Sequence, residues 1–159
     1  MTEPDTTAAD EPRVADIMVT DVVTVTPDMG VKEFAELMRD KGIGGAPVVN
    51  DNDELIGMVT EGDLMALDAA LHFPHYIQFL DSVIYLESGK KFEERLKKAL
   101  AATVGEVMTP QVRAVDPDDP VRKVATLMAD HGFDRVPVVE DGKVVGIVGR
   151  HDVLRVLGL

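Results

Sequence analysis

The sequence predicts an α/β (α+β) fold of two similar β-α-β-β-α repeats with a helical insert between them. Two observations carry this prediction. The chain matches itself at an offset of 90 residues, so that residues 14–51 align with 104–141. Short β-branched runs also alternate with segments whose apolar residues recur every three or four positions, the pattern of strands followed by amphipathic helices. A duplication of so long a period predicts two packed lobes, not a solenoid.

The self-match is carried by identical residues at matching positions of the two copies. After one extra residue in the first copy, the offset changes from 90 to 89. Matching pairs on both sides of this step include Met18/Met108, Pro27/Pro117, Gly42/Gly132, Gly57/Gly146 and Asp63/Asp152.

Each copy gives the same order of local signals. A β-branched run ends at a proline, an amphipathic helix ends at a glycine suited to a left-handed cap, and two apolar runs are joined by a polar turn. The predicted elements are strands over 22–25 and 112–115, helices from 31 to Gly42 and from 121 to Gly132, strands over 46–49, 55–59, 136–139 and 144–148, and a last helix after Gly62 and His151.

These signals divide the chain into four segments. We expect a disordered acidic tail over 1–13, a first repeat over 14–67, a helical insert over 68–103 and a second repeat over 104–159. The insert has apolar residues at helical spacing and Glu93/Lys97 and Glu94/Lys98 pairs one turn apart, so we expect it to be ordered. A copy of about 50 residues buries too little surface to be stable alone, so the copies should pack on each other.

Composition excludes several classes of function. Sixteen Lys and Arg against 29 Asp and Glu give a formal net charge of −13, which disfavours nucleic acid and anionic membranes as partners. The chain has no cysteine, which excludes disulfides and thiolate metal sites and fits the cytoplasm. Its most apolar stretch is interrupted by charged and polar residues, so we expect no membrane span.

Four segments resemble a tandem pair of CBS domains, also called a Bateman module. They are VADIMVTDVVTV and GGAPVVNDNDELIGMVTEGDLMAL in the first copy, and VGEVMTPQVRAV and FDRVPVVEDGKVVGIVGRHDVLRVL in the second. The resemblance implies two small α/β lobes related by a pseudo-twofold axis, with two clefts commonly occupied by adenosine-containing ligands. It also implies a module that forms homodimers and regulates an effector protein.

In this family the strand end G-h-h-T-x-x-D supplies a hydroxyl and a carboxylate to the ribose of the ligand. The resemblance therefore assigns ribose binding to Thr60 and Asp63, and a carboxylate can accept both donors of a cis-diol. The same pair also forms a helix capping box, and both roles can hold at once. In the second copy Asp152 keeps the carboxylate, but Gly149 replaces the threonine. This makes the cleft with Thr60 and Asp63 the safer site.

The second copy is basic at four positions where the first is not. Arg113, Arg135, Arg150 and His151 align with Val23, Gly45, Glu61 and Gly62. Guanidinium groups bind phosphate oxygens in a forked geometry, so the group favours an anionic ligand, although each residue alone is equally compatible with ordinary ion pairing. By resemblance, Arg135 or Arg150 can serve the phosphates in either cleft.

The resemblance places the adenine base between two segments of each copy, held mostly by backbone groups. The segments contribute Thr20, Val22, Val23, Ile43, Ala46 and Pro47 in the first copy, and Thr109, Val112, Arg113, Val136 and Pro137 in the second. His72 and His75 lack a third ligand, so we expect no metal.

The leading hypothesis is a non-catalytic sensor module that binds AMP, ADP, ATP or S-adenosylmethionine as a ligand and has no cofactor. No phosphate-binding loop or nucleophile–base pattern supports catalysis. Adenine nucleotides as ligands imply energy sensing in the cytoplasm, with occupancy reported through the packing of the copies or of a homodimer. The alternative is a ligand-free dimerisation or protein-interaction platform that uses the insert.

Overall fold

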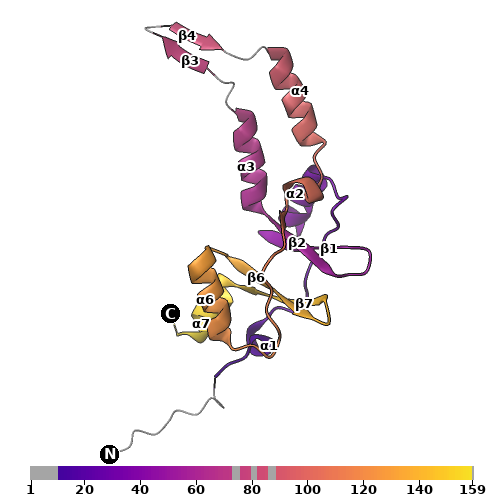
Figure 1. Ribbon diagram of the computed structural model, residues 1–159, viewed down its shortest axis with the longest axis vertical. Helices are drawn as coiled ribbons and strands as arrows, with labels where there is room; N and C mark the ends of the chain where they lie inside the picture. The colour runs from indigo at the N-terminus through magenta and orange to yellow at the C-terminus, as the bar shows by residue number, and fades with distance from the viewer. Residues whose placement is uncertain (1–10, 73–75, 80–81, 86–88, 159) are drawn as a thin grey trace, which may run out of the picture. The chain divides into compact units, whose positions relative to one another are not determined.

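The computed structural model describes residues 11–72, 76–79, 82–85 and 89–158 (Figure 1). The chain forms two compact units. Unit 1 comprises Met1–Val22, Asp53–Leu55 and Arg113–Leu159, and unit 2 comprises Val23–Asn52 and Ile56–Val112. Helices accompany antiparallel sheets in both units, which confirms the α/β (α+β) class.

Unit 2 contains most of the first repeat, the insert and the start of the second repeat, up to residue 112. Its three-stranded sheet has the order β1-β2-β5, and β2 pairs with β5 in antiparallel register, with Gly57 opposite Pro110. The elements are α2 (Val31–Lys41), β1 (Gly45–Val49), β2 (Leu55–Thr60), α3 (Glu61–His72), β3 (Tyr76–Phe79), β4 (Ser82–Tyr85), α4 (Gly89–Leu100), α5 (Val104–Val107) and β5 (Thr109–Pro110).

Unit 1 contains the second repeat from residue 113 onward and the start of the first repeat. Its antiparallel sheet pairs β6 with β7, from Arg135 opposite Gly149 to Glu140 opposite Lys143, with a bulge between Val138 and Val139. Its elements are α1 (Val14–Ile17), α6 (Val121–His131), β6 (Arg135–Glu140), β7 (Lys143–Gly149) and α7 (Arg150–Val156). The predicted left-handed caps are confirmed, since Gly42 and Gly132 end α2 and α6 with φ of 63° and 69°.

The two repeats exchange their first helices. Val14 of α1 is fully buried in the unit 1 core, and its N–H donates to the carbonyl of Asp119 (2.9 Å). At the matching position, Val104 of α5 is fully buried in the unit 2 core and donates to Met29 (2.8 Å). Each repeat therefore completes the core of the other, so neither core is continuous in sequence.

The two cores use equivalent positions with compensating volumes. Phe34 and Ala46 are fully buried in unit 2, and the matching residues of unit 1 are Val124 and Val136, also fully buried. A large and a small side chain in one core thus replace two medium ones in the other. Such volume-conserving exchanges are well tolerated in packed interiors.

The prediction of strands over 22–25 and 112–115 is wrong, because neither range forms a continuous strand. Only Val25 and Val115 form bridges, each parallel to a strand of the same unit. The N–H of Val25 donates to the carbonyl of Pro47 (3.0 Å), and the equivalent bond of Val115 is 3.1 Å. The reason is the exchange, because the chain changes from one unit to the other at residues 22–23 and 112–113.

The insert over 68–103 was expected to be helical, but it also contains two strands. It contains α4 and a β-hairpin in which Tyr76 of β3 pairs with Tyr85 of β4, and α3 continues past residue 68 to His72. Residues 1–10 of the predicted tail lie outside the described residues. Its end, from Glu11 to Arg13, packs on the start of α6, where Pro12 accepts the N–H of Val121 (3.0 Å). Among the described residues, no helix has the length and apolarity needed to cross a membrane.

Equivalent glycines in β2 and β7 allow the segments that follow α5 and α1 to pack closely against these strands. A Cβ on Gly57 would lie 2.8 Å from both the Met108 Sδ and the carbonyl oxygen of Thr109, and a Cβ on Gly146 would lie 2.6 Å from the Met18 Sδ. The methionine can move, but the backbone carbonyl of a paired strand cannot move without breaking the ladder.

Gly57→Ala is therefore expected to destabilise the protein more than Gly146→Ala. We expect a loss of about 1–3 kcal/mol for Gly57→Ala, the range for overpacking, and a smaller loss for Gly146→Ala. Urea denaturation of both variants measures the difference. A Gly57→Ala variant no less stable than Gly146→Ala would show that β5 yields freely.

Candidate functional site

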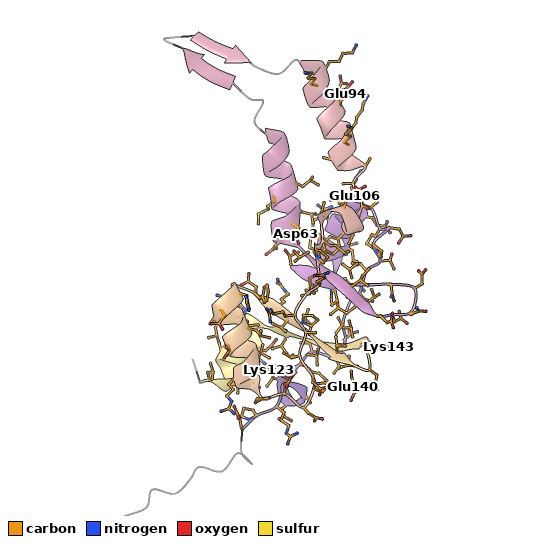
Figure 2. All side chains as sticks on the ribbon, in the orientation of Figure 1. Asp63, Glu94, Glu106, Lys123, Glu140 and Lys143 are labelled. Carbon is orange, nitrogen blue, oxygen red and sulfur yellow. The ribbon has the colours of Figure 1, made fainter. Side chains whose placement is uncertain are left out.

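The junction between β2 and α3 holds the first predicted pair. The backbone N–H and the Oγ1 hydroxyl of Thr60 both donate to Oδ2 of Asp63, at 2.8 and 3.1 Å. Both residues are half-buried, and Figure 2 shows Asp63 at the start of α3. Within the described residues, these bonds use only Oδ2, so Oδ1 remains an acceptor. The predicted capping role of Asp63 is confirmed at the N–H of Thr60.

The equivalent junction between β7 and α7 keeps the carboxylate and loses the hydroxyl. The N–H of Gly149 donates to Oδ2 of Asp152 (2.8 Å), the same bond that Thr60 makes to Asp63. The Oδ1 of Asp152 lies 3.8 Å from the guanidinium of Arg155. The two repeats thus share a carboxylate at the same place and differ in what surrounds it.

The basic residues of the second repeat all belong to unit 1. Arg135 is half-buried at the start of β6, directly opposite Gly149 in the sheet register, which places it beside the Asp152 turn. Arg113, Arg150 and His151 are exposed. Within the part of the chain that the structure describes, neither Arg113 nor Arg135 forms a salt bridge.

Arg150 has an ionic partner that the sequence reasoning missed. Its guanidinium lies 3.0 Å from Oδ1 of Asp134, and its backbone N–H donates to the Asp134 carbonyl (3.0 Å). The signal was available, because Asp134 aligns with Gly44 and the new acid accompanies the new base. The Arg150 side chain stays 53% exposed, so this is a surface ion pair. It uses one guanidinium nitrogen, and the other N–H groups remain as donors.

Several residues of the segments predicted to hold the adenine base are buried in the two cores. Ala46 and Val136 are fully buried core residues, and Pro47 and Pro137 are also buried. The carbonyls of the two prolines already accept bonds from the bridge valines. At these four positions only the backbone, and not the side chain, can take part in binding. Ile43 packs against the unit 2 core.

The remaining predicted residues lie nearer the surface. Thr20 and Thr109 are exposed, and Val22, Val23 and Val112 are half-buried.

The structure divides the predicted site residues between the two units. The exchange brings Thr20 and Val22 into the unit that holds the basic residues, away from their own repeat. Unit 1 holds Thr20, Val22, Arg113, Arg135, Val136, Pro137, Arg150, His151 and Asp152; unit 2 holds Val23, Ile43, Ala46, Pro47, Thr60, Asp63, Thr109 and Val112. Within the described residues there is no cluster of three metal-ligating side chains, and the rejected candidate His75 lies outside them.

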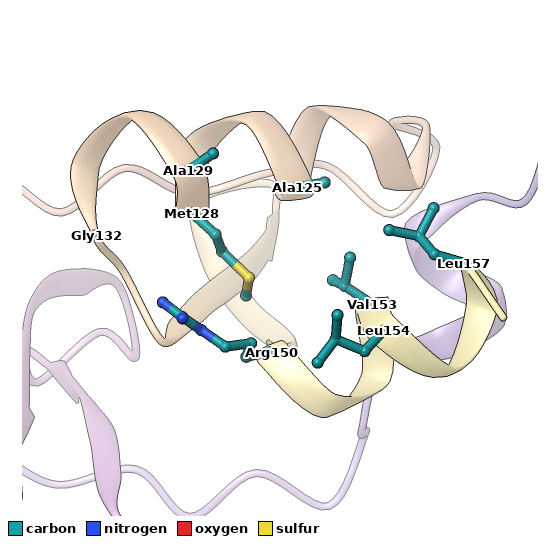
Figure 3. A pocket seen from close by; sticks show the side chains of 8 residues that line it. All are labelled: Ala125, Met128, Ala129, Gly132, Arg150, Val153, Leu154 and Leu157. Atoms are coloured by element: carbon teal, nitrogen blue, oxygen red, sulfur yellow. The ribbon is translucent and has the colours of Figure 1, made fainter. Parts of the chain in front are cut away.

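A groove lies between α6 and α7 of unit 1 (Figure 3). Its volume is about 380 Å³, and all but one of its lining residues are apolar or glycine; Arg150 is the exception. Arg150 is also the one residue that the groove shares with the predicted site. The lining consists of Ala125, Met128, Ala129, Gly132, Arg150, Val153, Leu154 and Leu157.

Known proteins share both the repeat and the fold. The family model of the CBS domain matches residues 14–70 and 104–159. An uncharacterised protein of Methanocaldococcus jannaschii is 33% identical over 154 residues, covering 91% of this chain and 90% of its own length. An uncharacterised protein of Methanopyrus kandleri is 32% identical over 144 residues, and this chain spans 61% of its length.

Two similar solved structures contain ligands. One is CBSX2 in complex with AMP, with a TM-score of 0.70, 30% identity, and coverage of 91% of this chain and 95% of that one. The other is the CBS domain pair of protein MJ0100 with 5′-methylthioadenosine and S-adenosyl-L-methionine. Its TM-score is 0.68 at 26% identity, with coverage of 93% and 97%.

Proposed function

Because the chain belongs to the CBS-domain family and carries two of its domains in tandem, we propose that it is a regulatory module that binds an adenosine-containing ligand. The observation that carries the proposal is the Asp63 carboxylate. It sits at a strand-to-helix junction with Oδ2 held by Thr60 and Oδ1 available. A fixed carboxylate with a free acceptor suits the ribose hydroxyls, since charge-assisted bonds are stronger than neutral ones. The complexes of CBSX2 with AMP and of MJ0100 with adenosyl compounds support the ligand class.

The choice among these ligands follows from the charges of unit 1, which holds Asp152, the equivalent of Asp63. Arg135 and Arg113 have no ionic partner among the described residues, and His151 is exposed beside Arg150. Guanidinium groups without a carboxylate partner suit phosphate oxygens. We therefore propose AMP, ADP or ATP ahead of S-adenosylmethionine, and sensing of adenine-nucleotide levels in the cytoplasm as the role. The module acts as a homodimer on an effector protein and does no catalysis itself.

Thermal unfolding with and without ligand tests the proposal. A ligand at one hundred times its dissociation constant stabilises the folded state by about 2.7 kcal/mol, because it binds the native state alone. We expect AMP or ATP to raise the melting temperature and inosine monophosphate, which lacks the 6-amino group, to raise it less. A melting temperature unmoved by all adenosyl compounds would favour the alternative, a ligand-free interaction platform.

Arg135→Ala and Arg150→Ala are expected to weaken ATP binding by about fivefold to tenfold, as the loss of a charged hydrogen bond in a half-exposed site should. Adenosine, which has no phosphate, should bind each variant as it binds the parent protein. Arg122→Ala is the matched control. Arg122 lies on α6 and pairs with Glu11, and 77% of the Arg122 side chain is exposed. Equal losses for ATP and adenosine would contradict a phosphate-reading role.

A further inference from the structure

We propose that Asp134 sets the preference of this module for AMP over ATP. Its carboxylate pairs with the guanidinium of Arg150 and therefore repels a phosphate that binds to the same guanidinium. This inference rests on the proposed function, because it concerns the phosphate groups of an adenine nucleotide held by the basic residues of unit 1. Asp134 acts on specificity through Arg150 and need not touch the ligand.

Asp134 and Arg150 are joined by a backbone bond and by a side-chain contact. The N–H of Arg150 donates to the carbonyl of Asp134 (3.0 Å), and guanidinium Nη2 lies 3.0 Å from Oδ1 of the Asp134 carboxylate. The backbone bond is common to both repeats, since the N–H of Glu61 donates to the carbonyl of Gly44 at the same distance. The side-chain contact has no counterpart there, because Gly44 has no side chain and Glu61 is an acid. The second repeat thus adds an acid–base pair to a backbone arrangement that the two repeats share.

The side-chain contact contributes little to stability. Both side chains lie at the surface, with exposed fractions of 69% for Asp134 and 53% for Arg150, and ion pairs at such places are weak. The backbone bond between the two residues does not depend on the carboxylate. Loss of the Asp134 charge should therefore leave the fold intact and change mainly what Arg150 binds.

The Asp134 carboxylate and a ligand phosphate compete for one cation. A guanidinium binds a carboxylate or a phosphate through its forked N–H groups. Because Nη2 of Arg150 already faces Oδ1 of Asp134, a phosphate on the remaining N–H groups lies close to a negative charge. Like charges repel within a Debye length, about 8 Å at physiological salt. ATP carries more negative charge than AMP, so the carboxylate weakens ATP binding more.

Arg135 gives a phosphate an unopposed cation in the same unit. It lies opposite Gly149 in the sheet register, and it has no salt bridge within the part of the chain that the structure describes. Arg150 is already partly neutralised by Asp134. One unopposed cation beside one neutralised cation suits a single phosphate better than a triphosphate.

Calorimetric titration of the full chain with AMP, ATP and adenosine, in the parent and in Asp134→Asn, tests the proposal. Asparagine keeps the shape of the side chain and one acceptor oxygen but removes the charge. We expect the affinity for ATP to rise about fivefold to tenfold and that for AMP about twofold to threefold. The affinity for adenosine should stay the same, because adenosine has no phosphate. The urea midpoint of the variant should equal that of the parent.

Two further variants separate the pair from an effect of net charge. Asp130→Asn removes the same charge from an exposed position on α6, where the described residues form no salt bridge with it. It should change the ATP affinity by less than about twofold, because screening limits the reach of a surface charge. In an Arg150→Ala background, Asp134→Asn should also gain less than about twofold, since no guanidinium then holds the phosphate beside position 134.

The outcomes distinguish this proposal from the proposed function. If the parent binds AMP and Asp134→Asn does not raise the ATP affinity, the role of Asp134 is refuted and the nucleotide-binding function stands. An equal gain for adenosine, an equal gain from Asp130→Asn, or a full gain without Arg150 would refute it in the same way. No binding heat from any of the three ligands, in parent and variant alike, would overturn the proposed function and this inference together.

Discussion

Val14→Asp is expected to unfold unit 1, although Val14 belongs to the first repeat in sequence. The side chain is fully buried among apolar residues of the second repeat, so a carboxylate there would be moved from water into an apolar core. The cost combines the lost apolar contacts with an unpaired buried charge, which exceeds about 4 kcal/mol. Hydrogen exchange followed by mass spectrometry should show lost protection in α6, β6, β7 and α7.

Val19→Asp is the matched control for this experiment. It makes the same chemical change five residues on, at a side chain that is 46% exposed, so its cost should stay within about 1 kcal/mol. A Val14→Asp variant as stable as Val19→Asp would contradict the exchange of first helices between the repeats.

Asp63→Ala is expected to weaken adenosyl-ligand binding at least tenfold while the fold is retained. The ribose would lose a charge-assisted bond, and such bonds contribute about 1.5–3 kcal/mol, of which about 1.4 kcal/mol corresponds to tenfold. The same change removes the acceptor for the N–H and hydroxyl of Thr60, so a loss of about 1 kcal/mol in stability accompanies it. Calorimetric titration with AMP measures the affinity.

Asp63→Asn separates the two roles of this carboxylate. The amide keeps one oxygen that can cap α3, but it removes the negative charge that strengthens a bond to a ribose hydroxyl. Stability should recover while the affinity stays low. An Asp63→Ala variant that folds and binds AMP as tightly as the parent would refute the ribose assignment.

Local sequence signals predicted the parts of the fold that depend on neighbouring residues. Gly42 and Gly132 cap their helices because few other residues adopt a positive φ at no cost, and Thr60 and Asp63 meet because they lie three positions apart. These features are fixed within one turn of chain. They can be read from the spacing alone.

The exchange of first helices could not be read in the same way. VADI and VGEV have the same apolar pattern, and each would complete either core, so periodicity says nothing about which core each one joins. The strand predicted over 22–25 failed for the same reason. A β-branched run favours extended backbone, but a strand also needs a partner along its whole length, and only Val25 has one.

The candidate site shows a similar division. Comparison of the two repeats drew attention to both groups of residues. The carboxylates are identical at aligned positions, and the basic residues stand where the first repeat has none. It missed the Arg150–Asp134 pair: the alignment shows a new acid in place of Gly44, but which base that acid contacts depends on tertiary placement.

Isothermal titration calorimetry of the purified chain with AMP, ATP and S-adenosylmethionine at physiological salt tests the central claim most directly. The account predicts saturable binding of at least one adenine nucleotide, with S-adenosylmethionine weaker because it offers no phosphate to the basic residues of unit 1. No binding heat from any of the three, at protein and ligand concentrations that would detect a micromolar complex, would contradict it.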